Sequence, residues 1–339
     1  MEKYLEKLEA YVKRASQKVS EIRCDDSLVF PLFSDLHTKD ADHEFMTRLI
    51  PAIKLVTESI KCDAVLDLGD NFDMLGRQIH ISNSELKARF ERVFEKIYEA
   101  SGKLPLINVN GNHDAIGTDF FKPCFWNDII KGKYGNDSAV FAKEESYYYI
   151  DYEKQNTRLV VLSLPHDSDI QAEMPTPLWE FGKKQLEWLK NTALDTSKYV
   201  IILSHVPFFS KYTGDMESTL GVWDGENAKL SFIANLCGWI DDLDEAVKII
   251  EKFDKREESR LVGVLSGHTH YDSLRKPYEE LNGKKNPLPC YQFVTGTACM
   301  PQANWPDMCI RLDIAVWTPS KGEFTLVRVG DGENRGIII

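Results

Sequence analysis

Short apolar runs separated by helical patterns recur along most of this chain. Six of these runs have the length and character of buried strands, and they lie at residues 27–33, 64–68, 104–109, 158–164, 199–203 and 261–265. Three segments with the apolar period of an amphipathic helix lie at 45–60, 84–100 and 182–194. Because sheets built from alternating strands and helices are covered by those helices, this order predicts an α/β fold. Pro31 cannot donate a backbone hydrogen bond, so we expect a bulge or an edge in the first strand.

The N-terminal residues form a pattern of their own. Apolar residues fall on one face of residues 4–22 and predict an amphipathic helix. We assign this helix to a short segment, 1–26, ahead of one domain over 27–339. The pattern leaves open whether the helix packs on that domain or pairs with another subunit.

Two later segments complete the organisation. Residues 211–260 contain a loop-like stretch followed by a helical pattern at 242–255, and we expect an insertion near the mouth of the site. The runs 309–317 and 323–329 predict a C-terminal β-hairpin.

The composition and charge exclude several classes of protein. With 43% hydrophobic and 28% charged residues, the chain is typical of a folded globular protein. No apolar stretch approaches the roughly 20 residues of a membrane helix, and the N-terminal residues carry acids and lack a signal peptide's apolar core, so we expect no membrane partner. Seven scattered cysteines without a C-x-x-C pair predict reduced thiols and a cytoplasmic location. The net charge of −12 disfavours nucleic acid as a partner and leaves small anionic substrates open.

Five of the six runs are followed directly by side chains that can bind a metal. The blocks after these runs read SDLH, GDNFD, NGNHD, SHVP and SGHTH. Each block alone has an ordinary alternative as a turn or a loop cap. Because open α/β sheets place their sites at the carboxyl ends of strands, we expect the five blocks to meet. Imidazole with carboxylate and amide oxygens suits Mn, Fe, Zn or Ni better than Ca, so together they predict a transition-metal site.

In this order, over residues 34–270, the five blocks resemble those of the calcineurin-like metallophosphoesterases. The resemblance implies a four-layer α/β/β/α sandwich of two mixed sheets, with two divalent or trivalent metal ions as cofactors. For the first ion, the resemblance implies the ligands Asp35, His37 and His270. For the second ion, it implies Asn112, His205 and His268, and Asp70 would bridge the two ions. The two histidines of GHTH would therefore bind different ions.

The resemblance gives catalytic roles to two further residues. His113 is the general acid that protonates the leaving group, and Asp73 is the acid that orients it. Asp114 is a second candidate for the orienting acid, and either acid could instead cap a loop. The implied reaction is the in-line attack of a metal-bridging hydroxide on phosphorus, without a covalent phospho-enzyme.

The resemblance implies an enzyme that hydrolyses phosphoester bonds and says less about its substrate. The protein phosphatases of this superfamily carry arginines in GDxxDRG and RGNHE, and here Met74 and Asn110 replace both of them. We therefore expect a phosphomonoesterase or phosphodiesterase with a small phosphorylated substrate, a nucleotide among the candidates. A DNA or RNA nuclease of the same superfamily is one alternative, and a catalytically inactive scaffold with the same fold is another. The sequence leaves the native metal pair and the oligomeric state open.

Overall fold

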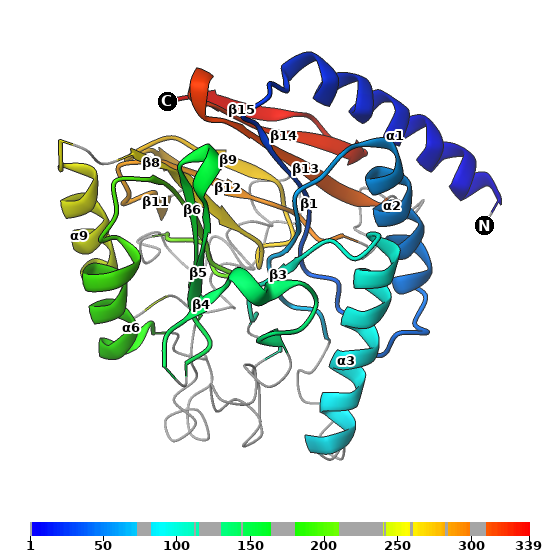
Figure 1. Cartoon of the computed structure of the whole chain (residues 1–339), viewed down its shortest axis with the longest axis horizontal. Helices are drawn as coiled ribbons and strands as arrows, with labels where there is room; N and C mark the ends of the chain where they lie inside the picture. Colours follow the sequence, from blue (N-terminus) through cyan, green and yellow to red (C-terminus); the bar gives the residue numbers. More distant parts are fainter. Residues whose placement is uncertain are drawn as a thin grey trace, which may run out of the picture.

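The computed structural model describes residues 2–72, 83–111, 113–114, 130–143, 145–163, 180–209, 240, 242–257, 260–281, 284–298 and 310–339. Within these residues, the strands form two large mixed sheets that pack against each other, with helices on both outer sides (Figure 1). Buried side chains of both sheets share one hydrophobic core. This arrangement confirms the predicted α/β/β/α sandwich.

The first sheet has the strand order β15-β14-β13-β1-β2-β3. Its strands are β1 (Leu28–Phe33), β2 (Val65–Asp67), β3 (Leu106–Asn108), β13 (Arg311–Thr318), β14 (Glu323–Gly330) and β15 (Arg335–Ile338). β1, β2 and β3 run parallel to one another, and β13 pairs with β1 in the antiparallel direction. The helices on its outer side are α1 (Glu2–Ile22), α2 (Met46–Ser59) and α3 (Asn83–Ala100).

The second sheet has the order β4-β5-β6-β7-β8-β12-β9, and β6, β7, β8 and β12 run parallel. Its strands are β4 (Val140–Phe141), β5 (Tyr148–Tyr152), β6 (Thr157–Val161), β7 (Tyr199–Leu203), β8 (Arg260–Ser266), β9 (Ser273–Arg275) and β12 (Tyr291–Val294). The helices on its outer side are α6 (Gly182–Trp188), which continues as a π-helical turn (Leu189–Ala193), and α9 (Leu243–Asp254). A separate pair joins β10 (Glu280–Leu281) to β11 (Lys284–Lys285).

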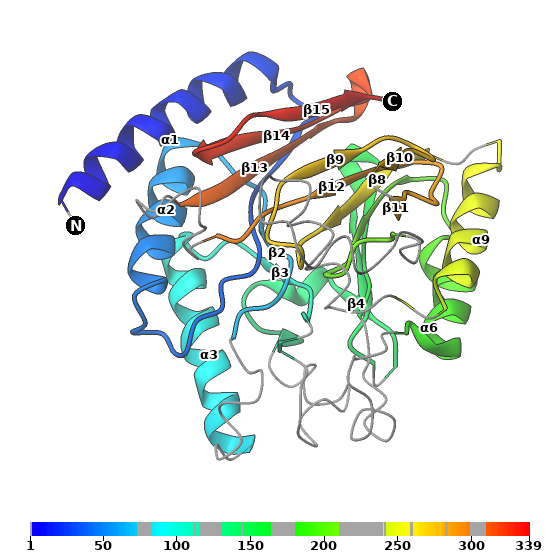
Figure 2. The same cartoon turned by 180° about the vertical axis from the view of Figure 1, so that it is seen from behind.

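The amphipathic patterns of two helices explain where these helices lie. Helix α1 packs on α2 and β14, so it covers the body of the protein (Figure 2). The residues that it buries are spaced three or four apart: Leu8, Val12, Ala15 and Val19. Helix α9 buries the apolar face that the sequence pattern indicates: Leu243, Ala246, Val247, Ile250 and Phe253. The division into 1–26 and 27–339 stays a prediction.

Pro31 lies in a central strand, so the expectation of an edge or a bulge there was wrong. β1 pairs with β13 without a register shift on one side and with β2 on the other. Two residues earlier, Val29 exchanges hydrogen bonds with Asp63 on the β2 side. Because alternate residues of a strand turn their N–H groups the same way, the nitrogen of Pro31 also faces that side. Pairing with β2 begins only at Leu32, so the N–H that Pro31 lacks would lie just before the first hydrogen bonds between β1 and β2.

The remaining predicted elements are also present. All six predicted strands and the C-terminal hairpin of β13 and β14 are found. The strands β5, β12 and β15 were not predicted, because polar residues interrupt their short apolar runs. Residues 210–239 lie outside the described residues, so the insertion near the site mouth stays a prediction. No described helix combines the length and apolar character that crossing a membrane requires.

Polar contacts between the two sheets align the strand ends. Tyr148 in β5 donates its hydroxyl hydrogen to the carbonyl oxygen of Asn108 in β3 (2.9 Å) and accepts the N–H of the same residue (3.0 Å). Trp317 in β13 donates its indole N–H to the hydroxyl of Thr157 in β6 (2.9 Å). With the sheets in this register, the loops after β1, β2, β3, β7 and β8 meet.

Candidate metal centre

Five of the predicted ligands have an unusual backbone conformation. Each lies in a loop directly after a strand, and each has a positive φ: Asp35 (53°), His37 (46°), Asp70 (55°), His268 (68°) and His270 (60°). This left-handed region is costly for residues with a side chain, and such residues concentrate at functional sites. The surrounding contacts must therefore hold these loops in place.

The first ligand group consists of Asp35, His37 and His270, whose potential ligand atoms all lie within 4.8 Å of one another. The Nε2 atoms of His37 and His270 are 3.0 Å apart. The Nε2 atom of His270 is 3.3 Å from Oδ1 of Asp35. Two imidazoles and one carboxylate that face the same small volume fit a divalent transition metal.

The second ligand group consists of Asp70, His205 and His268, again within 4.8 Å of one another. Oδ2 of Asp70 lies 3.1 Å from Nε2 of His205 and 3.8 Å from Nε2 of His37, which belongs to the first ligand group. This one oxygen therefore faces imidazoles of both groups. A carboxylate in this position can bind two ions at once.

Burial and charge set the protonation of these side chains. Burial lowers the pKa of His37 to about 4, against the opposing charge of Asp70, and lowers the pKa of His268 to about 3. Both rings are thus neutral near pH 7, which is the form that binds metals. Burial also acts to lower the pKa of His205, but the charges of Asp70 and Asp35 and the hydrogen bonds to Asp70 and Leu68 together outweigh it and raise the pKa to about 9. Burial acts to raise the pKa of Asp35, but the charges of His270 and His205 and the hydrogen bond with His270 together outweigh it and lower the pKa to about 2.

Hydrogen bonds orient the ligands toward the centre. Nδ1 of His205 is 2.7 Å from the carbonyl oxygen of Leu68, which leaves Nε2 directed at Asp70. The carboxylate of Asp35 accepts the N–H of His268 at 3.0 Å and the hydroxyl of Ser34 at 2.5 Å. Partners of this kind fix the tautomer and the direction of a metal ligand.

Two glycines allow the loops to approach this closely. A Cβ atom on Gly111 would lie 2.2 Å from the backbone nitrogen of Asp70. A Cβ atom on Gly267 would lie 1.8 Å from the hydroxyl oxygen of Ser34. No other residue fits at either position without displacing a ligand loop.

Asp114 has the structural role that the sequence left open for it. Its fully buried carboxylate accepts four backbone N–H groups, those of Asp70, Asn71, Phe72 and Gly111, at 2.9–3.2 Å. Asp114 therefore caps the loop after β2 and ties it to the loop after β3. Because both oxygens are used in this way, the loop cap and not the orienting acid is the role that this geometry supports.

His113 lies beside both ligand groups. Its backbone N–H donates to Oδ1 of Asp70 (2.7 Å), and its Nε2 is 3.9 Å from Oδ2 of the same residue. Its ring meets the ring of His37 edge-on, with centroids 4.5 Å apart, and its side chain is 14% exposed. The position suits a general acid at the rim, and it is also close enough for a ligand. The predicted ligand Asn112 and the predicted acid Asp73 lie outside the described residues.

The comparisons with known proteins agree with this geometry. The sequence model of the calcineurin-like phosphoesterases matches residues 30–272, which is most of the chain. The chain belongs to the calcineurin-like phosphoesterases. This family consists of metal-dependent phosphoester hydrolases, and the two ligand groups of this member are candidate sites for the metal.

The other comparisons add the fold. No curated protein shows a significant match to this phosphoesterase. A solved structure described as that of PhoD is similar, with a TM-score of 0.53 and 13% identity over 92% of this chain and 68% of that chain. At this identity the likeness shows the fold alone.

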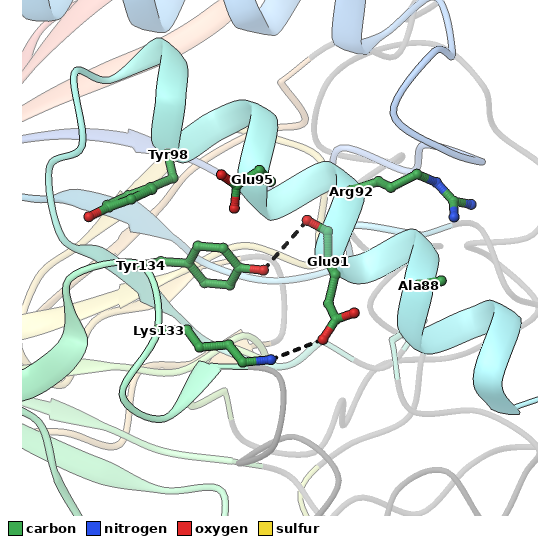
Figure 3. Close-up of a pocket in the computed structure, with 7 residues that line it drawn as sticks. All are labelled: Ala88, Glu91, Arg92, Glu95, Tyr98, Lys133 and Tyr134. Atoms are coloured by element: carbon green, nitrogen blue, oxygen red, sulfur yellow. Dashed lines mark hydrogen bonds and ion pairs between the residues drawn. The ribbon is translucent and has the colours of Figure 1, made fainter.

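A groove of about 660 Å³ lies along α3 of this phosphoesterase (Figure 3). Its lining consists of Ala88, Glu91, Arg92, Glu95, Tyr98, Lys133 and Tyr134. The carboxylate of Glu91 pairs with Lys133 at 2.9 Å inside the groove. None of the candidate ligands lines it, so the groove is not part of the metal centre.

Buried residues that the sequence analysis missed hold the ligand-bearing loops of this phosphoesterase in place through hydrogen bonds. Asp67, at the end of β2, accepts the side-chain amides of Asn71 (2.8 Å) and Asn108 (2.7 Å) and the backbone N–H of Gly69 (2.9 Å). Burial raises the pKa of Asp67 to about 6, although these three donors oppose the rise. The only signal in the sequence is a charged residue inside the apolar run AVLDL.

Proposed function

We propose that this chain is a dinuclear metal-dependent phosphomonoesterase or phosphodiesterase. One observation carries the proposal: Oδ2 of Asp70 faces His37 of the first ligand group and His205 of the second. A shared carboxylate between two groups of nitrogen and oxygen ligands fits a pair of neighbouring cations. The expected substrate is a small phosphorylated molecule, with nucleotides among the candidates.

The assignment of ligands follows the two groups. The first ion takes Asp35, His37 and His270, and Asp70 bridges the ions. The second ion takes His205 and His268, together with Asn112. The set of imidazoles, carboxylates and one amide favours Mn, Fe, Zn or Ni.

The charges around the centre favour an anionic substrate. Two divalent ions would bring four positive charges, and the carboxylates of Asp35 and Asp70 would return two negative ones. The centre would therefore attract a phosphate group although the chain carries a net charge of −12. When bound, the metal ions supply Lewis acidity and a nucleophile derived from water at neutral pH.

His113 has the position of a general acid in this proposal. Its side chain is partly exposed beside the buried ligands, so it can reach the leaving oxygen of a bound substrate. An imidazole can transfer a proton near neutral pH, which is the role that Asp73 would support by orienting the ring.

Metal removal tests the proposal. The purified chain should contain about two transition-metal ions per molecule when its metal content is measured by mass spectrometry. Exhaustive chelation should abolish hydrolysis of p-nitrophenyl phosphate and bis-p-nitrophenyl phosphate, and added Mn²⁺ should restore it. Full activity in a preparation without metal would exclude this function. A panel of monoesters, diesters, cyclic nucleotides and nucleotides would then identify the substrate class.

Two alternatives make different predictions. A nuclease would act on DNA or RNA with activity that falls steeply with salt, and the acidic composition gives it no support. An inactive scaffold would have lost ligands, yet six of the seven predicted ligands are described and all six lie in the two groups. We also propose a cytoplasmic location, in keeping with the free thiols of Cys24, Cys62 and Cys290 among the described cysteines.

A further inference from the structure

A buried ionic network lies behind the loop that carries His270. Arg328 in β14 binds Oδ1 of Asp313 at 2.9 Å and Oδ1 of Asp272 at 2.6 Å. Arg335 in β15 binds the other oxygen of Asp313, also at 2.6 Å. The side chain of Asp313 is fully buried, and that of Arg328 is 2% exposed. Four charged groups from three strands and one loop thus meet inside the protein.

The network ends directly at the ligand loop. Asp272 is two residues after His270, and its carboxylate also accepts the N–H of Gly296 at 3.0 Å. Gly296 lies against the same loop, since a Cβ atom there would be 3.1 Å from the carbonyl oxygen of His270. At the other end of the loop, the N–H of His268 donates to Asp35. The loop is therefore held at both ends, once by a ligand and once by the network.

The loop needs such restraint. His268 and His270 both have positive φ values, 68° and 60°, which an isolated peptide would avoid. Between the two ends, the N–H of Thr269 donates to the carbonyl oxygen of Gly267 within the loop itself. Removal of one end would leave His270 free to relax toward an ordinary conformation.

We propose that Asp272 and Arg328 are positioning residues for His270. They hold the loop from the first sheet, so that Nε2 of His270 stays beside Asp35 and His37. Arg328 lies in the C-terminal hairpin, beyond residues 30–272 that match the family model, so this support for the loop comes from outside the matched part of the chain. This inference rests on the proposed function, because it takes the first ligand group to be a metal site.

A general stabilising role is the competing explanation, and the chain contains a matched control for it. Arg158 in β6 forms a similar but only partly buried pair with Asp151 in β5, at 2.7 and 2.8 Å. Arg158 also binds the carbonyl oxygens of Thr192 and Ala193 at the end of the π-helical turn. None of these partners is a candidate ligand. Substitution of Arg158 should therefore cost stability without moving His270.

The experiment compares Asp272→Asn and Arg328→Lys with Arg158→Lys in the full chain. Mn²⁺ is titrated calorimetrically into each metal-free protein, and thermal unfolding is recorded in parallel. We expect Arg158→Lys to bind two ions with the same affinities as the wild-type chain. In Asp272→Asn and Arg328→Lys, one ion should bind about 10–100-fold more weakly while the other keeps its affinity, as for other residues that support metal ligands. Asp272→Asn keeps the shape of the side chain but removes the charge that pairs with Arg328, so it gives the answer if Arg328→Lys does not fold.

The possible results separate the two claims. Wild-type affinity for both ions in Asp272→Asn would overturn the positioning role, and so would an equal weakening of both ions. An equal loss of affinity in Arg158→Lys would also overturn it, since a general loss of stability would then explain the effect. A wild-type chain that binds no Mn²⁺ and contains no metal would instead overturn the proposed function on which the inference rests.

Discussion

The two ligand groups differ in how far they are buried. In the second group, Asp70, His205 and His268 are all buried, and His205 is paired with Asp70 at 3.1 Å. In the first group, the side chain of His270 is 23% exposed, and His113 lies nearby with 14% of its side chain exposed. Both groups contain an imidazole–carboxylate pair, so they differ in exposure: the second group is closed, whereas the first opens toward solvent. Under the proposed function, this difference predicts that the substrate enters, and that the proton is transferred, on the side of the first group.

The largest effect is expected where the two groups meet. Asp70→Asn keeps the shape of the side chain and removes the shared negative charge. Both ions should be lost, and turnover should fall about 10³-fold or more, because a metal ion supplies several kcal/mol of transition-state stabilisation. Metal content after dialysis and hydrolysis of bis-p-nitrophenyl phosphate measure the two effects. Asp151→Asn, a carboxylate remote from the ligands, serves as the control. If Asp70→Asn kept one ion at wild-type affinity, the groups would be independent sites.

A substitution of His113 tests whether the general acid lies beside the first ligand group, which is open to solvent. His113→Ala should keep both ions, and turnover should fall about 10²–10⁴-fold, in the range typical of general acids. The loss should shrink for a substrate with a good leaving group such as p-nitrophenol, because that group needs no proton. Measurement of metal content beside turnover makes the assignment sharp. Loss of one ion in this variant would show that His113 is a ligand and that the first group is larger than proposed.

The location of the groups followed from the sequence because each ligand stands directly after a strand. Parallel strands of a sheet end on the same side, so side chains that follow such strands are expected to meet, and His205 and His268 do so because β7 and β8 are neighbours. The four-layer arrangement came from the resemblance of the motif blocks. Alternation alone predicts strands and helices but does not say that they divide into two sheets.

The supporting residues could not be predicted in the same way. Asp114 follows His113 in the sequence, and only the structure shows that its carboxylate accepts four backbone N–H groups. Arg328 lies in a strand of the other sheet, 58 positions after His270 in the sequence, so no local pattern connects the two. The expectation of an edge or a bulge at Pro31 was wrong because the cost of a proline in a strand depends on which neighbouring strand its nitrogen faces. All three features depend on how segments far apart in the sequence lie beside each other, and the spacing of apolar residues along the chain does not predict this.

The stability of the metal-free protein should distinguish the closed group from the open one. His205→Ala leaves Asp70 buried without its nearest imidazole, and loss of one partner of a buried ion pair costs about 3–5 kcal/mol. His270→Ala should cost less, because Asp35 keeps its hydrogen bonds from Ser34 and from the N–H of His268. Urea unfolding of both variants at pH 6 measures the difference. Equal losses in the two variants would mean that burial does not separate the groups.

The smallest predicted effect concerns pH, and it again depends on the pair in the closed group. Burial acts to lower the pKa of His205, but the charge and hydrogen bond of Asp70, together with Asp35 and the carbonyl of Leu68, outweigh it and raise the pKa to about 9, above its ordinary value of 6.5. The pair therefore stabilises the metal-free protein fully below pH 6.5, and this contribution is lost as the pH rises through about 9. An ion must displace the same proton, so affinity for the second ion should rise up to tenfold per pH unit toward pH 9.

Calorimetric titration of Mn²⁺ at pH 6.5, 7.5 and 8.5 measures this competition, in buffers that differ in ionisation enthalpy. The second ion should release about one proton from His205 at the two lower pH values and a smaller fraction at pH 8.5. The rings of His37 and His268 are neutral throughout this range and should release none. An affinity that stays constant over these two pH units would show that the proton on His205 does not compete with the ion. The electrostatic role assigned to the His205–Asp70 pair in the second group would then be wrong, and only the difference in burial between the two groups would remain.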